Sequence, residues 1–233
     1  MPEPIVMCWS GGKESAVALG TLSRQPEYIV VSLLTTVTAG YDRISMHGVR
    51  RSLLSQQTDS IGLPLREVEI PQQASNEIYE RNMGVVFAEM YSQGIRKVAF
   101  GDIFLEDLRE YRQRQLAEFE LECLFPIWQR DTSDLIEEFI SDGYRGVTVC
   151  VDPRRLDESF VGRELDRDFV AALPPDVDPC GENGEFHSFV FDGPLFTEEI
   201  SFSRGEVVQR DSFLFCDLLS GEESNPTPKQ TAV

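Results

Sequence analysis

One stretch near the N-terminus decides the fold: Ile5-Val6-Met7-Cys8-Trp9-Ser10-Gly11-Gly12-Lys13-Glu14-Ser15. The segment Ile5–Trp9 is apolar throughout, as expected for a strand that is buried on both faces. From Glu14 to Ser23 apolar residues recur at helical spacing. The glycine pair between them lets the backbone turn tightly and directs N–H groups and a helix N-terminus towards one anion. The stretch therefore predicts a phosphate loop between a first strand and a first helix.

The side chains of this loop suit a phosphate ligand. Ser10 and Ser15 can donate hydroxyl hydrogen bonds, and Lys13 can offset negative charge. The loop is neither GxxxxGK[ST] nor GxGxxG, so neither a Walker A site nor a dinucleotide site is expected. An ordinary Gly-rich turn with an N-capping serine is the plain alternative. The position at the first strand-to-helix junction favours phosphate binding.

Strand and helix patterns alternate through about residue 150, which predicts βαβ units and a mostly parallel sheet covered on both faces. Such sheets bind ligands beyond the carboxyl ends of their strands, here the loops after Trp9, Leu34, Phe100 and Trp128. Further strands are expected at Tyr28–Leu34, Leu65–Ile70, Lys97–Phe100, Leu124–Trp128 and Val147–Val151. Helices are expected at Val49–Ile61, Ile78–Ser92, Leu108–Leu121, and from an N-cap at Thr132 or Ser133 through Ile140.

The pattern changes after residue 150. Residues 1–150 are interpreted as an ATP-binding α/β domain, and residues 151–219 as a smaller, substrate-binding α+β subdomain. Alternating segments around Phe186–Phe191, Ile200–Phe202 and Val207–Phe215 suggest some antiparallel strand in the second part. Residues 220–233 are polar and contain proline, so a disordered tail is expected there.

Composition excludes several classes of function. The chain carries 21 basic and 40 acidic residues, a formal charge of −19, so nucleic acid is not expected as a partner. The five cysteines are scattered without a CxxC pair and there are two histidines, which argues against disulfides and a zinc site. No apolar run approaches the roughly 20 residues that span a bilayer, and no secretory signal is apparent. A cytoplasmic protein is expected.

The SGGKES loop resembles the SGGxDS signature of the PP-loop superfamily of ATP pyrophosphatases, with Glu14 in place of the usual aspartate. The resemblance implies a Rossmann-like adenine-nucleotide alpha-hydrolase domain. It also implies a reaction in which a substrate oxygen attacks the α-phosphate of ATP, pyrophosphate leaves, and a nucleophile then displaces AMP. ATP and Mg²⁺ are the implied cofactors, with Glu14 as a tentative metal ligand. The implied ATP contacts in the loop are Ser10, Gly11, Gly12, Lys13, Glu14 and Ser15.

Later segments resemble the diphthine–ammonia ligase family, which has similar LDESxxGR, GExGEF/Y and PLF stretches. These segments are Leu156-Asp157-Glu158-Ser159-Phe160-Val161-Gly162-Arg163, Cys180-Gly181-Glu182-Asn183-Gly184-Glu185-Phe186-His187-Ser188-Phe189 and Asp192-Gly193-Pro194-Leu195-Phe196. Like residues also occur at Trp128-Gln129-Arg130, at Gly101 with Tyr111-Arg112, and at His47 before Gly62-Leu63-Pro64. The resemblance extends to about Ser203.

This second resemblance implies roles for particular residues. His47 and Gly101 would contact ATP, and Lys13, Glu182 and Glu185 would be catalytic. Substrate contacts are implied for Tyr111, Arg112, Glu158, Arg163, Gly181, Glu182, Gly184 and Glu185.

The residues themselves leave alternatives open. Glu182 and Glu185 place two carboxylates in a tight loop, where they could hold Mg²⁺, ammonium or a trimethylammonium group, or could simply be solvated. Glu158 and Arg163 could form an ion pair that braces the structure instead of contacting substrate. His187 alternates with Phe186 and Phe189, which favours a structural role.

The sequence thus predicts an ATP-dependent, amide-forming ligase that uses ammonia from solution or from a partner protein. The segment Asp102–Glu110 is longer than the family spacing, so the carboxylate acceptor is left open: diphthine on elongation factor 2, or an unidentified small molecule as for a bacterial relative. Alternatives are a non-catalytic ATP or AMP sensor and a tRNA-modifying PP-loop enzyme. A homodimer is a further expectation.

Overall fold

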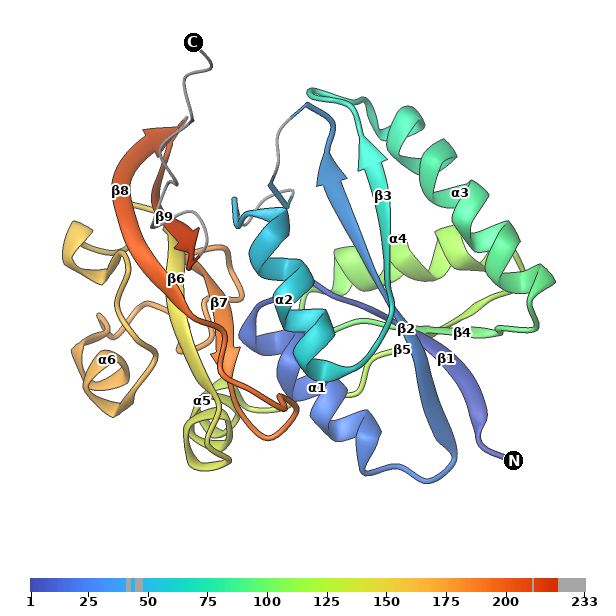
Figure 1. Cartoon of the computed structure of the whole chain (residues 1–233), viewed down its shortest axis with the longest axis horizontal. Helices are drawn as coiled ribbons and strands as arrows, with labels where there is room; N and C mark the ends of the chain where they lie inside the picture. The colour runs from blue at the N-terminus through green and yellow to red at the C-terminus, as the bar shows by residue number, and fades with distance from the viewer. Residues whose placement is uncertain (41–42, 45–47, 211, 222–233) are drawn as a thin grey trace, which may run out of the picture.

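The first of two β-sheets is entirely parallel. The computed structural model describes residues 1–40, 43–44, 48–210 and 212–221. The strands of this sheet lie in the order β3-β2-β1-β4-β5 (Figure 1). Their bounds are β1 (Glu3–Cys8), β2 (Tyr28–Thr38), β3 (Leu65–Ile70), β4 (Lys97–Ala99) and β5 (Glu122–Leu124). The predicted parallel α/β sheet is confirmed.

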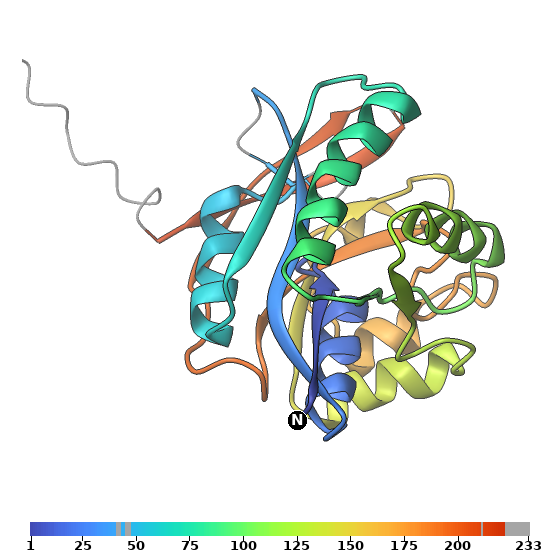
Figure 2. The same ribbon diagram turned by 90° about the vertical axis from the view of Figure 1, so that its right-hand side faces the viewer.

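Helices cover both faces of this sheet, because the chain reverses its direction of travel across the sheet between β3 and β4. One face packs on α1 (Lys13–Ser23), α2 (Arg51–Ile61) and α5 (Thr132–Ser141). The other packs on α3 (Asn76–Ser92) and α4 (Glu106–Ala117), through residues such as Phe87 and Leu116. Figure 2 shows the cyan α2 and the green α3 on opposite sides of the sheet.

The second sheet is antiparallel, in the order β7-β6-β9-β8. The short helices η1 (Glu158–Phe160) and α6 (Arg167–Ala172) interrupt the chain between its first two strands. The bounds of the strands are β6 (Arg145–Val151), β7 (Phe186–Asp192), β8 (Phe202–Arg210) and β9 (Phe213–Ser220).

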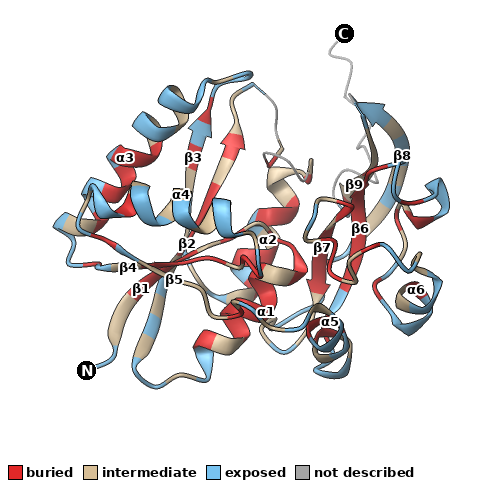
Figure 3. Ribbon diagram, turned by 180° about the vertical axis from the view of Figure 1, so that it is seen from behind, coloured by how far each residue is buried: buried red, intermediate tan, exposed pale blue. Residues whose placement is uncertain are grey.

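Both sheets share one hydrophobic core. A single cluster joins Leu19 of α1 and Leu53 of α2 to Val149 of β6 and Phe189 of β7. Helices α1 and α2 accordingly lie between the sheets in Figure 1, and the buried residues concentrate on α1, β6 and β7 in Figure 3. No helix in the described ranges has the length and apolar character needed to traverse a bilayer.

Several expected elements differ from those observed. Val147–Val151 does not close the parallel series, because β6 pairs antiparallel with β7 and β9. The residues Val147–Val151 are all buried, and a continuous apolar run is equally consistent with a strand in a parallel or an antiparallel sheet. Leu124–Trp128 is not a strand: β5 ends at Leu124, just before Pro126, which cannot donate to a ladder. The N-cap of α5 is Asp131, neither Thr132 nor Ser133.

Two other expectations concern the C-terminal tail and the boundary between domains. The expected tail at 220–233 lies outside the described residues beyond position 221, while Ser220 itself ends β9. The division of the chain into domains at about residue 150 stays a prediction.

Candidate functional site

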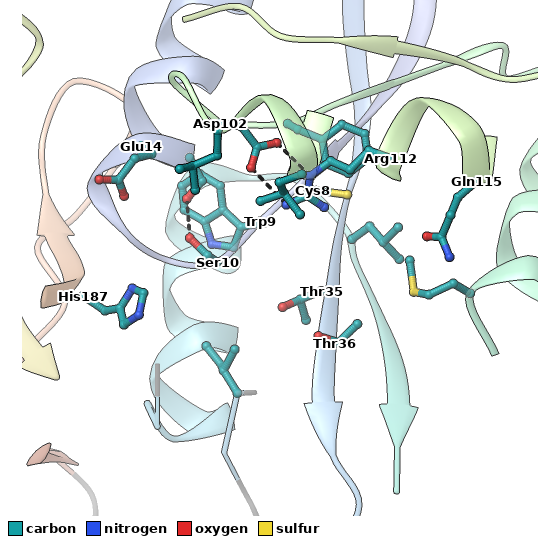
Figure 4. Close-up of a pocket in the computed structure, with 18 of the residues that line it drawn as sticks. Cys8, Trp9, Ser10, Glu14, Thr35, Thr36, Asp102, Arg112, Gln115 and His187 are labelled. Carbon is teal, nitrogen blue, oxygen red and sulfur yellow. Dashed lines mark hydrogen bonds and ion pairs between the residues drawn. The ribbon is translucent and has the colours of Figure 1, made fainter. Parts of the chain in front are cut away.

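A cavity of about 390 Å³ opens at the carboxyl ends of β1, β2 and β4. This is the point where the strand order reverses, the usual ligand site of open α/β sheets. The loops after Trp9 and Phe100 line the cavity, as predicted, but the loop after Trp128 does not. Leu34, Thr35 and Thr36 line it from within β2, which continues to Thr38 instead of ending at Leu34. Polar side chains line the cavity from several elements: Ser10, Glu14, Ser15, Thr35, Thr36, Tyr79, Asp102, Arg112, Gln115, Glu182 and His187. Figure 4 shows eight of them with labels: Ser10, Glu14, Thr35, Thr36, Asp102, Arg112, Gln115 and His187.

The phosphate loop presents its two serine hydroxyls together. Ser10 Oγ lies 3.1 Å from Ser15 Oγ and accepts the Gly12 N–H at 3.2 Å, while the Ser15 hydroxyl donates to the Gly12 carbonyl at 2.9 Å. Gly11 has a φ of +78°, in the left-handed region that favours glycine. The expected strand–loop–helix geometry is therefore present, with both hydroxyls at the start of α1.

Gly101 brings β4 against the first turn of α1. A Cβ at this position would lie 3.0 Å from the Glu14 carbonyl carbon and 3.1 Å from the Ser15 nitrogen. Because these are backbone atoms, they cannot easily move aside. Gly101 lines the cavity next to the phosphate loop, and its contact with ATP stays a prediction.

Lys13 is buried beside the cavity and does not line it. The side chain is 3% exposed, forms an ion pair with Glu14 and lies over the Phe186 ring at 4.6 Å. Burial lowers the pKa of Lys13, but the charges of Glu14 and Glu182 outweigh it and hold the pKa above its ordinary value. Lys13 therefore places a permanent positive charge behind the phosphate loop.

Glu182 reaches the cavity from the loop that precedes β7. Its Oε1 accepts the Ile103 N–H at 2.8 Å. Burial, and then the like charges of Glu14 and Asp102, raise the pKa of Glu182 to about 7. A carboxyl group with this pKa is partly protonated near neutral pH and can accept or release a proton there.

Glu185 does not join Glu182 in the cavity. It is 1% exposed, and its Oε1 accepts the Asp178 N–H at 3.2 Å and an Asn183 side-chain N–H at 3.1 Å. The buried Glu185 carboxylate therefore stabilises the turn that precedes β7. Gly184 also lies off the cavity, whereas Gly181 lines it and needs its positive φ of +68°.

Arg112 lines the cavity, but its neighbour Tyr111 does not. Arg112 Nε lies 2.7 Å from Asp102 Oδ2, and the guanidinium lies over the Phe100 ring at 4.4 Å. The Tyr111 hydroxyl donates to Glu80 at 3.2 Å in an outer groove between α3 and α4. Consecutive helical residues point in different directions, so the two cannot both face the cavity.

The remaining sequence candidates lie elsewhere. Glu158 is exposed, and Arg163 lies over the Phe160 ring at 5.0 Å. Although both belong to the described part of the chain, no ion pair joins them, so the expected brace is wrong. His47 falls outside the described residues.

Other cavity residues were not predicted. His187 lines the cavity opposite Arg112 (Figure 4), and burial, followed by the charge of Lys13, lowers its pKa to about 4, so its imidazole is neutral. The expected structural role did not anticipate this position. Thr35, Thr36 and Asp102 were missed. Asp102 follows the end of β4, a position that could have identified it, whereas Thr35 and Thr36 lie within β2.

Sequence comparisons agree with this geometry. Residues 4–121 match the diphthamide synthase N-terminal domain, and residues 131–219 match the diphthamide synthase C-terminal domain. The diphthine–ammonia ligase of Bos taurus is 29% identical over 126 residues, 52% of this chain and 47% of that protein. The Homo sapiens protein of the same name is 26% identical over 166 residues, 64% of this chain and 62% of that protein. The chain thus matches less than two thirds of the length of these relatives.

Proposed function

We propose that this chain, which belongs to the diphthamide synthase family, is an ATP-dependent ligase that forms an amide. One observation carries the proposal: the phosphate loop after β1 and the Gly181-Glu182 loop before β7 line the same cavity. In the proposed reaction, an oxygen of a carboxylate acceptor attacks the α-phosphorus of ATP and pyrophosphate leaves. Ammonia then attacks the acyl carbon, loses a proton, and AMP leaves with the bonding electron pair.

The phosphate loop would bind and orient ATP. The hydroxyls of Ser10 and Ser15 and the N-terminus of α1 are directed to one end of the cavity, where they suit phosphate oxygens. Lys13 would stabilise the charge that develops on the phosphates from behind the loop, without touching them. Positioning and charge stabilisation of this kind account for most of the catalysis of phosphoryl and nucleotidyl transfer.

Glu182 would handle the proton of the second step. Its raised pKa of about 7 makes it a base that is partly ionised at neutral pH, within the same cavity as the phosphate loop. The ionised form would attract ammonium and accept the proton that ammonia loses during attack. Glu185, fixed within the turn, would support this loop without contacting substrate.

Mg²⁺ fits the carboxylates that line the cavity, Glu14, Asp102 and Glu182. No group of three or more candidate metal-ligating side chains is preassembled among the residues that the structure describes. A Mg²⁺ ion that arrives with ATP needs only one or two protein carboxylates besides phosphate and water, so this arrangement suffices. Glu14 would be the ligand, and the ion would neutralise phosphate charge.

The acceptor is the least defined part of the proposal. Diphthine is suggested by the name of the relatives, and its attachment to elongation factor 2 by the resemblance described above. An unidentified small carboxylate is suggested by the longer Asp102–Glu110 segment. Leu105 and Leu108 of this segment line the cavity, as do Tyr79 and Met83 of α3. Free ammonia, a cytoplasmic location, the absence of nucleic acid and a homodimer all stay predictions.

One observation favours a second candidate, a non-catalytic ATP or AMP sensor. The Lys13 ammonium is paired with Glu14 and lies over the Phe186 ring, and Lys13 itself does not line the cavity. A loop in this state could bind nucleotide without promoting attack at the α-phosphorus.

Nucleotide analysis distinguishes the two. The protein would be incubated with Mg-ATP and ammonium, with or without diphthine-bearing elongation factor or a desalted small-molecule extract. Release of AMP and pyrophosphate, dependent on one acceptor and on ammonium, is the expected result. Glu182→Gln should slow it strongly, whereas the exposed Glu206→Gln should not. ADP as the sole product contradicts the ligase proposal, and ATP binding without turnover supports the sensor.

A further inference from the structure

Gln57 is a buried amide that the proposed chemistry does not use. It lies on α2, is 0% exposed and does not line the cavity. Its Oε1 accepts the indole N–H of Trp9 at 3.1 Å. Its Nε2 donates to the carbonyl of Gly11 at 3.0 Å and to the carbonyl of Val190. An indole N–H on one side and two carbonyls on the other fix which atom is oxygen and which is nitrogen.

These contacts converge on the back of the phosphate loop. Gly11 also accepts the Val190 N–H at 2.9 Å, and a Cβ on Gly11 would lie 2.8 Å from Gln57 Oε1. Two residues further along the loop, the Lys13 N–H donates to Ser188 Oγ at 3.2 Å. Gly11 and Lys13 of the loop are therefore hydrogen-bonded to Val190 and Ser188 of the edge strand β7. Gln57 is hydrogen-bonded to both Gly11 and Val190.

Strand β7 follows directly from the loop that carries Glu182, and it contains His187. The Gln57 amide thus connects the serine side of the cavity to the side supplied by the second sheet. An amide with all of its hydrogen bonds made in a buried site resists displacement, because each lost bond leaves a desolvated polar atom.

We propose that Gln57 is a positioning residue that holds the phosphate loop in its nucleotide-binding shape and fixes it to β7. This inference rests on the proposed function, since it presumes that the loop binds the phosphates of ATP. Gln57 does not line the cavity, so it acts on the ligand through the residues that it bonds: Trp9, Gly11 and Val190. Its loss should therefore weaken contacts with the phosphates and spare those with the nucleoside.

Binding measurements on paired variants test this. Gln57→Glu keeps the acceptor for Trp9 and loses both donors, and Gln57→Met removes all three bonds at similar volume. The control is Gln56→Met on the same helix. By calorimetry, the Kd for Mg-ATP should rise about tenfold or more in both Gln57 variants, the loss expected for one or two buried hydrogen bonds. Binding of adenosine, which lacks phosphates, should change less than about twofold.

The alternatives give different results. An unchanged Kd for Mg-ATP in a folded Gln57 variant overturns the proposal, and equal weakening of ATP and adenosine reduces Gln57 to a general structural role. If the unsubstituted protein fails to bind ATP, the proposed function itself is wrong. Should both variants fail to fold, hydrogen exchange of the unsubstituted protein decides. ATP must then slow exchange of the Val190 amide, and an unaffected amide contradicts the inference.

Discussion

At the residue scale, Glu182 combines a functional position with a cost to stability. The pKa of this carboxyl, about 7 in the fold, lies above its ordinary value of 4.5. The folded chain therefore retains a proton that the unfolded chain releases, and stability falls as pH rises from about 4.5 to about 7. Below that window both states are protonated and the cost is absent.

Glu182→Gln should accordingly stabilise the protein at pH 8 and have little effect at pH 4. The amide oxygen can still accept the Ile103 N–H, so the native contact is kept. After allowance for partial exposure, we expect a gain of roughly 1–2 kcal/mol in the free energy of unfolding. Urea titrations of both proteins at the two pH values measure it. An equal difference at pH 4 and pH 8 would show that titration is not the cause.

Gly101→Ala should disturb the candidate site where the segment after β4 packs against the first turn of α1. The added methyl group would meet the backbone of Glu14 and Ser15 at 3.0–3.1 Å. We expect a loss of about 1–3 kcal/mol in stability, the usual effect of overpacking, and weaker binding of Mg-ATP. Gly221→Ala is the matched control, because no atom of the described residues lies within 4 Å of its Cβ position. Unfolding and calorimetric titration of the two variants provide the comparison.

At the element scale, Asp131 caps the N-terminus of α5. Asp131 Oδ1 accepts the N–H groups of Ser133 and Asp134 at 2.9 and 3.1 Å. Asp131→Ala should cost about 1 kcal/mol of stability, as for other N-caps. Ser133→Ala, at the position expected from the sequence, should cost less than about half of that. Thermal unfolding of the two variants decides, and the reverse ranking would place the cap at Ser133.

Elements defined by local pattern could be predicted from the sequence. The phosphate loop was predictable because a strand, a glycine pair and a helix start follow one another in the chain. The sheet that receives Val147–Val151 was not, because a continuous apolar run does not identify its partner strands. The same limit applies to the site. Gly181 and Glu182 were found by motif, whereas the burial of Glu185, the outward position of Tyr111 and the contacts of Gln57 depend on residues far away in sequence.

At the scale of the whole molecule, an ionic contact joins the second sheet to the segment between β2 and α2. Asp217 of β9 lies 2.8 Å from both Arg43 and Arg50, which precede α2. Burial acts to raise the pKa of Asp217, but hydrogen bonds from Arg50 and Arg43 outweigh it and lower the pKa to about 2. This stabilisation is present above the ordinary pKa of about 3.8 and is lost as pH falls towards 2.

Asp217→Asn should therefore cost about 1–2 kcal/mol at pH 7, where it leaves two partly buried guanidinium groups without their carboxylate. The difference between the variant and the unsubstituted protein should shrink as the pH falls below 4. Urea unfolding at pH 7 and pH 3 gives both values. A difference independent of pH would mean that shape, and not charge, is responsible.

The attachment of the phosphate loop to β7 has a consequence for solubility. Strand β7 ends its sheet, and a bare sheet edge invites pairing with a neighbouring chain. Here the loop and Gln57 occupy the Val190 N–H and carbonyl on that side. The strand at the opposite edge of the sheet, β8, carries the charged residues Arg204, Glu206 and Arg210, which disfavour pairing with another chain. A substitution that loosens the phosphate loop would therefore expose the edge of β7 to pairing with another chain and promote aggregation.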